Sequence, residues 1–245
     1  MELEYRTSWR CPEEADARVL GGPNIVKPLM KCAPRVYMGQ AAWDKLRKRT
    51  YFLADYKCQI CGKDCSTPGT LDAHELYTVN YMDGTAVFAR VFALCKACHS
   101  FYHSGRLLTL HKQGSPLYSA KHVLNVLEHG FKLIHDWNVA HPDKPKLKAY
   151  GAILDGLKQE DLREPLTELI KEYDMEFWEE DPKRLAKWKD WKLVYGRQII
   201  RTPYASPKEW EEAMAEASKT DSERQPNPFS GGVFDEINDL LKDEN

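Results

Sequence analysis

The sequence lacks any long apolar run and any clear excess of charge of one sign. No stretch approaches the roughly 20 apolar residues that a membrane-spanning helix needs, and Met1–Tyr5 has neither the basic start nor the apolar core of a signal peptide. The 35 Lys and Arg residues nearly balance the 37 Asp and Glu residues, and no internal repeat is visible. We therefore expect a cytoplasmic globular protein with no membrane partner.

The cysteine pattern argues against a disulfide framework. There are seven cysteines, an odd number, and four of them form two Cys-x-x-Cys pairs. Two such pairs from different parts of the chain can satisfy one tetrahedral zinc ion with four thiolates, and the alternative is a set of buried free thiols. The predicted ligands of a structural zinc are Cys58, Cys61, Cys95 and Cys98, and the expected free thiols are Cys11, Cys32 and Cys65.

The chain divides into four regions. Residues 1–40 are rich in Pro and Gly and predict an extended arm, whereas residues 41–110 contain both cysteine pairs. Residues 111–217 are expected to be mostly helical, and residues 218–245 to form a flexible linker and an acidic tail. The predicted fold class is α+β, with a small metal-held module followed by a helical region.

The cysteine-containing region has a defined order of elements. Apolar residues at helical spacing predict an amphipathic helix over 41–56. Two strand-like runs, Leu71–Tyr77 and Val87–Phe92, flank Asp83-Gly84, which is a strong hairpin-turn signal. A turn and a helix are expected from Cys95 to about Leu110, so the order is knuckle, strand, strand, knuckle, helix.

Helical patterns continue toward the C-terminus. We expect helices over 119–139 and 152–175, the second divided in two by Pro165. A further helix is expected to hold Trp188 and Trp191, whose side chains are predicted to be core anchors.

The last predicted helix begins at Ser206-Pro207. A capping residue, a Pro at the first helical position and Glu209 coincide there. Beyond the predicted linker, the acidic segment Phe234–Asn245 has one apolar face. It is interpreted either as a frayed tail or as a short helix that binds a protein partner.

Three histidines have the spacing of a second metal site. His99 and His103 are four residues apart and would face the same way on a helix, and His74 on the first strand is the obvious third ligand. Three neutral imidazoles leave coordination positions open, which is the condition for a catalytic metal site. The alternative is that His99 and His103 are solvated or packing residues, or substitute for a knuckle ligand.

These stretches together resemble the HNH endonuclease family, in its phage and bacterial zinc-knuckle type. The resemblance covers roughly residues 33–106 and is carried by Trp43–Arg47, Tyr56–Gly62, Leu71–Glu75 and Ala93–His103, with Pro34-Arg35 and Gly39 as a similar lead-in. It implies a ββα-metal, treble-clef module that hydrolyses phosphodiester bonds, with DNA as the expected nucleic-acid partner. The implied catalytic cation is Mg, Mn, Ni or Zn, held by His74, His99 and His103.

The chain departs from the family pattern at two positions. Glu75 stands where the family has the histidine that activates water, and Arg90 aligns with the central asparagine that orients this base. Glu75 can serve as a general base, and Arg90 can hold it in place or bind the scissile phosphate. The alternative is a degenerate module of a phage-type protein, which would act by binding a host protein or nucleic acid.

A basic cluster precedes the first knuckle. The residues that can bind a nucleic-acid backbone are Lys45, Arg47, Lys48, Arg49 and Lys57. The other interpretation is a solvated helix face.

Overall fold

The computed structural model describes residues 16–21, 25–30, 32–179 and 186–222. They form an α+β fold, as predicted. The central sheet has the order β1-β2-β5-β6, and the second sheet is a two-residue parallel pair of β3 and β4. The strands are β1 (Leu71–Asn80), β2 (Thr85–Cys95), β3 (Ala149–Tyr150), β4 (Phe177–Trp178), β5 (Lys192–Tyr195) and β6 (Gln198–Arg201).

The predicted hairpin is confirmed as β1 and β2. The two strands pair antiparallel, and His74 lies opposite Phe92. The turn contains Gly84 with a φ of +70°, a left-handed conformation that glycine adopts without steric cost. The register shifts between Leu76 and Tyr77, where a bulge bends the hairpin.

The helices next to the hairpin are α2 (Gln40–Leu53), α3 (Lys96–Tyr102) and α4 (Ser104–Lys112). The prediction of a single helix up to about Leu110 is therefore wrong. His103 interrupts it with φ −96° and ψ 35°, so this residue ends α3 and starts α4. The amphipathic helix expected over 41–56 is present as α2, although none of its residues is fully buried.

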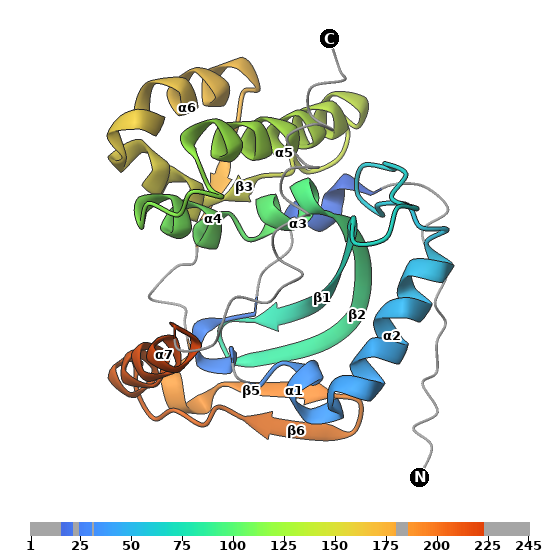
Figure 1. The fold of residues 1–245 in the computed structure, drawn as a ribbon, viewed down its shortest axis with the longest axis vertical. Coiled ribbons are helices and arrows are strands. Elements are labelled where there is room, and N and C mark those ends of the chain that lie inside the picture. The colour runs from blue at the N-terminus through green and yellow to red at the C-terminus, as the bar shows by residue number, and fades with distance from the viewer. Residues whose placement is uncertain (1–15, 22–24, 31, 180–185, 223–245) are drawn as a thin grey trace.

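Helices also pack together at the far end of the molecule from the sheet (Figure 1). They are α5 (Ala120–Ala140), the 3-10 helix η3 (Gly151–Lys158) and α6 (Glu160–Glu172). The prediction of a break at Pro165 is wrong, because Pro165 lies inside α6 and the division falls at Gln159 instead. Leu162 and Leu166 are fully buried, and their packing offsets the backbone hydrogen bond that the proline removes.

The C-terminal part of the described chain differs most from the prediction. The prediction of a helix around Trp188 and Trp191 is wrong, since only a short 3-10 turn, η5 (Trp188–Asp190), precedes β5 and β6. Strand β5 pairs parallel with β2, and Thr85 lies opposite Lys192. Residues far apart in the sequence thus complete one sheet.

The final helix, α7 (Pro207–Ser222), begins where the capping signal predicted it. The Ser206 hydroxyl accepts a hydrogen bond from the Glu209 N–H at 3.3 Å. Because α7 continues to Ser222, the linker does not start at residue 218 as expected. The remaining linker and the acidic tail lie outside the described residues.

The N-terminal region is not a simple extended arm. Its described residues form the 3-10 helices η1 (Ala17–Gly21) and η2 (Lys27–Leu29) and the helix α1 (Pro34–Met38). Proline in the first turn favours the last two, because its fixed φ suits a helix start. Leu20 and Leu29 are buried, so these short elements contribute to the core.

Two apolar clusters hold the fold together. The larger one runs without interruption from Ile60 and Phe92 of the cysteine-containing region to Leu127 and Leu162 of the helical region. The predicted boundary at residue 110 thus lies inside a shared core. The smaller cluster joins Leu29 to the sheet. Within the described ranges, no helix is long and apolar enough to cross a membrane.

Candidate metal centre

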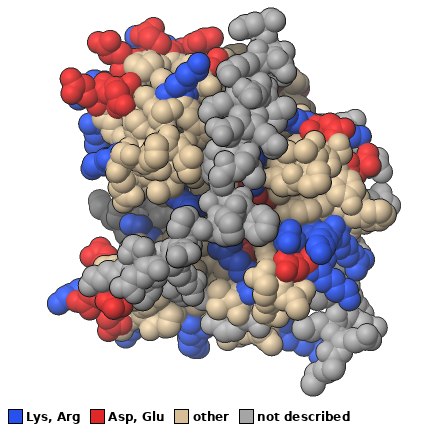
Figure 2. Space-filling view, in the orientation of Figure 1, with Lys and Arg blue, Asp and Glu red and all other residues tan. Residues whose placement is uncertain are grey.

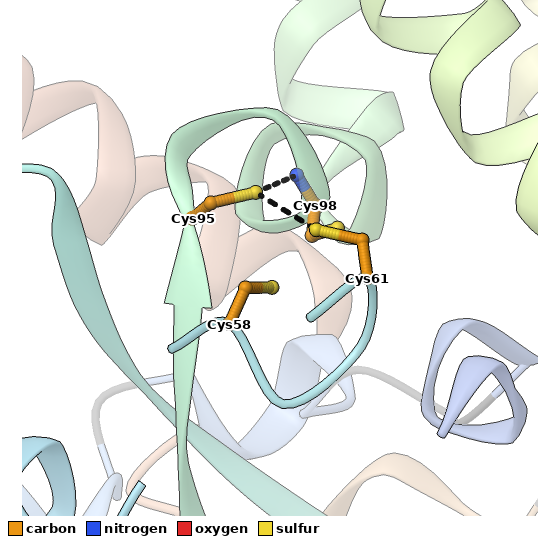
Figure 3. Close-up of side chains that lie close together, drawn as sticks. All are labelled: Cys58, Cys61, Cys95 and Cys98. Atoms are coloured by element: carbon orange, nitrogen blue, oxygen red, sulfur yellow. Dashed lines mark hydrogen bonds between the residues drawn. The ribbon is translucent and has the colours of Figure 1, made fainter. Parts of the chain in front are cut away.

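The two cysteine pairs come together as one cluster (Figure 3). The sulfur atoms of Cys58, Cys61, Cys95 and Cys98 all lie within 4.8 Å of one another. The Cys61 and Cys95 sulfurs are 3.8 Å apart. Tetrahedral zinc with Zn–S bonds of about 2.3 Å places its sulfurs about 3.8 Å apart, so the cluster fits this ion. The four cysteines can therefore hold a structural zinc, as predicted.

Local backbone structure presents these thiols. In the first pair, the Gly62 N–H donates to the Cys58 carbonyl at 2.9 Å, and Gly62 has a φ of +74°. Gln59 ties this turn to β2, because its backbone N–H donates to the Ala93 carbonyl and its side-chain oxygen accepts from the Ala93 N–H. In the second pair, the Cys95 sulfur caps α3 by accepting from the Cys98 N–H at 3.5 Å.

The electrostatics of the cluster favour a bound cation. Hydrogen bonding to Cys58 holds the pKa of Cys61 far below its ordinary value and raises the pKa of Cys95. The pKa of the buried Cys98 is raised by the same neighbour. Four thiols at this distance cannot all ionise unless a cation offsets their charge, and zinc supplies that charge. Cys32 and Cys65 are free thiols, as expected, and Cys11 lies outside the described residues.

The three predicted histidines also converge. His74 extends from β1, His99 from α3, and His103 from the junction of α3 and α4, and their ligand atoms lie within 4.8 Å of one another. The Nε2 atoms of His74 and His103 are 3.0 Å apart. Metal–nitrogen bonds of about 2.0–2.1 Å place adjacent ligand nitrogens about 3 Å apart. The ring of Tyr102 packs on His74 with ring centres 4.2 Å apart.

Burial keeps the imidazoles of His74 and His103 neutral. It lowers the pKa of His74 to about 2, and the charges of His103 and His99 add to this shift. Burial likewise lowers the pKa of His103 to about 3. A neutral imidazole is the form that binds metal, so at neutral pH these two side chains do not have to lose a proton to act as ligands.

The structure adds Asp72 to the site. Its Oδ2 lies 2.8 Å from the Nδ1 of His99, and its Oδ1 accepts from the Lys96 ammonium at 2.6 Å. Burial would raise the pKa of Asp72, but the hydrogen bond to His99 and the charges of His99 and Lys96 outweigh it and lower this pKa. With Nδ1 donating to the carboxylate, the Nε2 lone pair of His99 is left for a ligand.

The position of Asp72 was readable from the sequence. It precedes His74 by two residues on β1, so the two side chains leave the same side of the strand. The alternation that identifies a strand therefore also predicts that Asp72 and His74 are neighbours.

Glu75, the residue after His74 on β1, is buried and has an arginine partner. Its exposed fraction is 8%, and its Oε1 has no hydrogen-bond partner among the described residues. The Nε of Arg35 lies 3.8 Å from this oxygen. Burial raises the pKa of Glu75, and the charge of Arg35 opposes part of that rise.

Arg90 was expected either to hold Glu75 in place or to bind the scissile phosphate. The Arg90 guanidinium lies over the Phe92 ring, 4.2 Å from its centre. The cation that faces Glu75 is Arg35 of α1, which was noted in the sequence only as part of the lead-in. The exposed side chains of Arg35 and Arg106 also contribute to the lowered pKa of His103, which places two positive charges around the triad.

The basic residues ahead of the first knuckle lie on and just after α2. Figure 2 shows Lys and Arg side chains gathered on the flank of the molecule where α2 runs. Lys45, Lys48 and Arg49 are exposed. Arg47 forms an ion pair with Asp44 at 2.6 Å, and Lys57 forms one with Asp55 at 2.9 Å.

Comparisons with protein-family models, with curated proteins and with solved structures give no match.

Proposed function

We propose that this protein is a metal-dependent endonuclease of the HNH type that hydrolyses phosphodiester bonds in DNA. The observation that carries the proposal is the convergence of His74, His99 and His103 on one point. The charges of two exposed arginines, Arg35 and Arg106, act on His103. A hairpin followed by a short helix supplies all three histidines, which is the arrangement that the resemblance implies for a nuclease.

A divalent cation such as Mg, Mn, Ni or Zn would be held by the three histidines, and zinc by the four cysteines. Two features of the chain support the first of these sites: the spacing of the imidazole nitrogens and the Asp72 carboxylate that orients His99. When bound, the cation would supply a Lewis acid for the phosphate and for the leaving oxygen. Three protein ligands leave room for substrate.

Glu75 would act as the general base. Burial raises its pKa toward the working pH, which makes a carboxylate a better proton acceptor than its ordinary value allows. Its Oε1 is an acceptor that no described residue occupies. Arg35, at 3.8 Å, would keep the carboxylate ionised and oriented.

The arginines and the basic helix would bind the nucleic acid. Arg35 and Arg106, whose charges act on His103, would pair with a phosphate bound near the triad, because guanidinium groups pair well with phosphate oxygens. Lys45, Lys48 and Arg49 on α2 would contact the backbone further away and position it without reading its sequence.

The decisive test is cleavage of supercoiled plasmid DNA by the purified chain, with each cation added separately after chelation of loosely bound metal. We expect His99→Ala to abolish cleavage and to retain the zinc of the cysteine cluster, measured by elemental analysis. His122→Ala is the matched control, because His122 is a half-buried histidine of α5 outside both clusters.

The competing function is binding without catalysis. The replacement of the family histidine by Glu75 favours this alternative. Equal cleavage by the wild-type chain and His99→Ala would refute the nuclease site. DNA retention in a gel-shift assay without cleavage under any cation would favour the degenerate module.

A further inference from the structure

His129 links the helical region to the cysteine cluster. It lies on α5, is half-buried, and its Nε2 is 3.3 Å from the sulfur of Cys98. Cys98 is completely buried. The contact joins residues 31 positions apart, and it lies outside both the histidine triad and the zinc ligand set.

The position of His129 is set by close packing of α5 on α3. Gly130, the next residue, lies so close to Phe101 that a Cβ there would be 2.1 Å from the phenyl ring. Phe131 adds an edge-to-face contact with Phe101, with ring centres 5.9 Å apart. The helices therefore hold the imidazole next to the sulfur, and its approach does not depend on a mobile loop.

A tetrathiolate site needs such a donor. Four thiolates around a divalent ion leave a net charge of about −2 in a buried place, and hydrogen-bond donors must offset it. Among the described residues, the groups outside the thiols within hydrogen-bond distance of these sulfurs are the Cys98 backbone N–H, at 3.5 Å from the Cys95 sulfur, and the His129 Nε2. The His129 Nε2 donates in the tautomer that carries its proton there. His129 is the one whose contribution a substitution can remove.

We propose that His129 is an outer hydrogen-bond donor of the zinc site, which makes the Cys98 thiolate less reactive toward electrophiles and so slows the loss of zinc. The Nε2–H draws electron density from the sulfur, which lowers its basicity and its nucleophilicity. The donor comes from the helical region, so that region would help to retain the metal. This inference concerns the cysteine cluster alone and does not depend on nuclease activity.

The test is zinc release from the full zinc-loaded chain, followed with a chromogenic chelator after addition of N-ethylmaleimide. We compare His129→Phe, which keeps a ring but removes the donor, with His129→Gln, which restores an N–H. Removal of such an outer partner commonly costs 10–100-fold in metal affinity, so we expect release from His129→Phe to be roughly 10-fold faster. Release from His129→Gln should lie near the wild-type rate.

His135→Phe is the matched control. It removes a histidine of the same helix whose Nδ1 bonds the Tyr173 carbonyl at 3.0 Å, away from the cluster. Its release rate should stay near that of the wild type. An equal effect of His135→Phe and His129→Phe would overturn the proposal, because it would indicate general loosening of α5. A wild-type rate in His129→Phe, or no rescue by Gln, would overturn it as well.

A spectroscopic measurement covers the case in which His129→Phe folds poorly. In the cobalt-substituted chain, a hydrogen bond to a thiolate lowers the energy of its lone pair and raises that of the sulfur-to-metal charge-transfer transition. We expect this band of His129→Ala to lie at longer wavelength than in the wild type and in His129→Gln. Superimposable bands in the three proteins would exclude the hydrogen bond.

Discussion

Cys98 and His99 are adjacent in the chain, yet the side chain of Cys98 belongs to the cysteine cluster and that of His99 to the histidine triad. The first turn of α3 therefore contributes to both groups. Any change that displaces this turn is expected to affect both candidate metal sites. The helix has only seven residues, so little of it is left to hold one site when the other is lost.

Loss of one zinc thiolate should unfold the region around the cluster. We predict that Cys95→Ser abolishes zinc binding at the cysteines, because three thiolates and a hydroxyl form a much weaker site, and zinc binding free energy is also folding free energy. Elemental analysis and far-UV circular dichroism measure the two effects. Cys65→Ala, at a buried cysteine outside the cluster, should keep its zinc. A Cys95→Ser chain that retains stoichiometric zinc would contradict this assignment.

Asp72 should affect metal binding at the triad through its hydrogen bond to His99. We predict that Asp72→Asn lowers the affinity of the triad for Mn²⁺ by about 10–100-fold, since an amide orients the imidazole less well and does not raise its basicity. Isothermal titration calorimetry measures this affinity. Lys96→Met serves as comparison, because it removes the other partner of Asp72 but keeps the bond to His99. An equal loss of Mn²⁺ affinity in both variants would show that the charge around Asp72, and not its hydrogen bond to His99, determines the affinity.

Under the proposed nuclease function, Arg35 would bind the phosphate, a role that the sequence allowed for Arg90. We predict that Arg35→Met reduces plasmid cleavage by about 10-fold or more, because it removes the guanidinium that faces Glu75. Arg90→Met should have a smaller effect on cleavage, since its guanidinium lies over Phe92. The reverse order of effects would favour the role of Arg90 inferred from the family resemblance.

The Glu75 side chain should lower the free energy of unfolding at pH values at which its carboxylate is ionised. Burial raises its pKa above the ordinary value of 4.5, so the folded chain binds this proton more tightly than the unfolded chain does. The free energy of unfolding should therefore fall as the pH rises through the interval above 4.5. We predict that Glu75→Gln is more stable than the wild type at pH 7–8, by on the order of 1 kcal/mol.

The pH dependence is the control for this prediction. Well below pH 4.5 the wild-type carboxyl group is protonated in both the folded and the unfolded state, so the difference in stability between the two proteins should shrink there. Urea denaturation at several pH values measures it. If Glu75→Gln is less stable at every pH, Glu75 stabilises the fold and the activity argument loses its support.

Gly130 tests the packing of α5 on α3. We predict that Gly130→Ala lowers the free energy of unfolding by about 1–3 kcal/mol, because the new methyl group would overlap the Phe101 ring and the helices would have to move apart. Gly105→Ala in α4 is the matched control. Its Cβ would lie 3.6 Å from that of Ala152, an ordinary contact, so alanine should be neutral or stabilising there. Thermal denaturation distinguishes the two.

Local signals in the sequence predicted local structure well. The Asp83-Gly84 turn and the Ser206-Pro207 cap each specify a backbone conformation within a few residues, and both are present. Each Cys-x-x-Cys spacing is a local ligand signal, and the cluster was predicted because one tetrahedral zinc ion requires both pairs. The nearness of His74 to Asp72 also follows from strand alternation alone.

The features that the sequence did not predict depend on contacts between segments that are distant along the chain. Strand β5 is only four residues long and is stabilised by parallel pairing with β2, so nothing near Trp191 indicates a helix or a strand decisively. Arg35 of α1 lies 3.8 Å from Glu75 of β1, a residue far from it in the sequence. Pro165 was read as a helix break, but the burial of its neighbours Leu162 and Leu166 overrides its local preference.

The parallel pairing of β2 with β5 also determines how this chain can be divided. A protein that ended near Leu110 would keep all seven candidate metal ligands, yet the backbone groups of Thr85, Ala86 and Val87 would lose their strand partner. It would also expose the face of α3 that α5 covers. The candidate catalytic centre is therefore not a portable unit. Transplanting it to another protein as a fusion would require residues up to Arg201 at least.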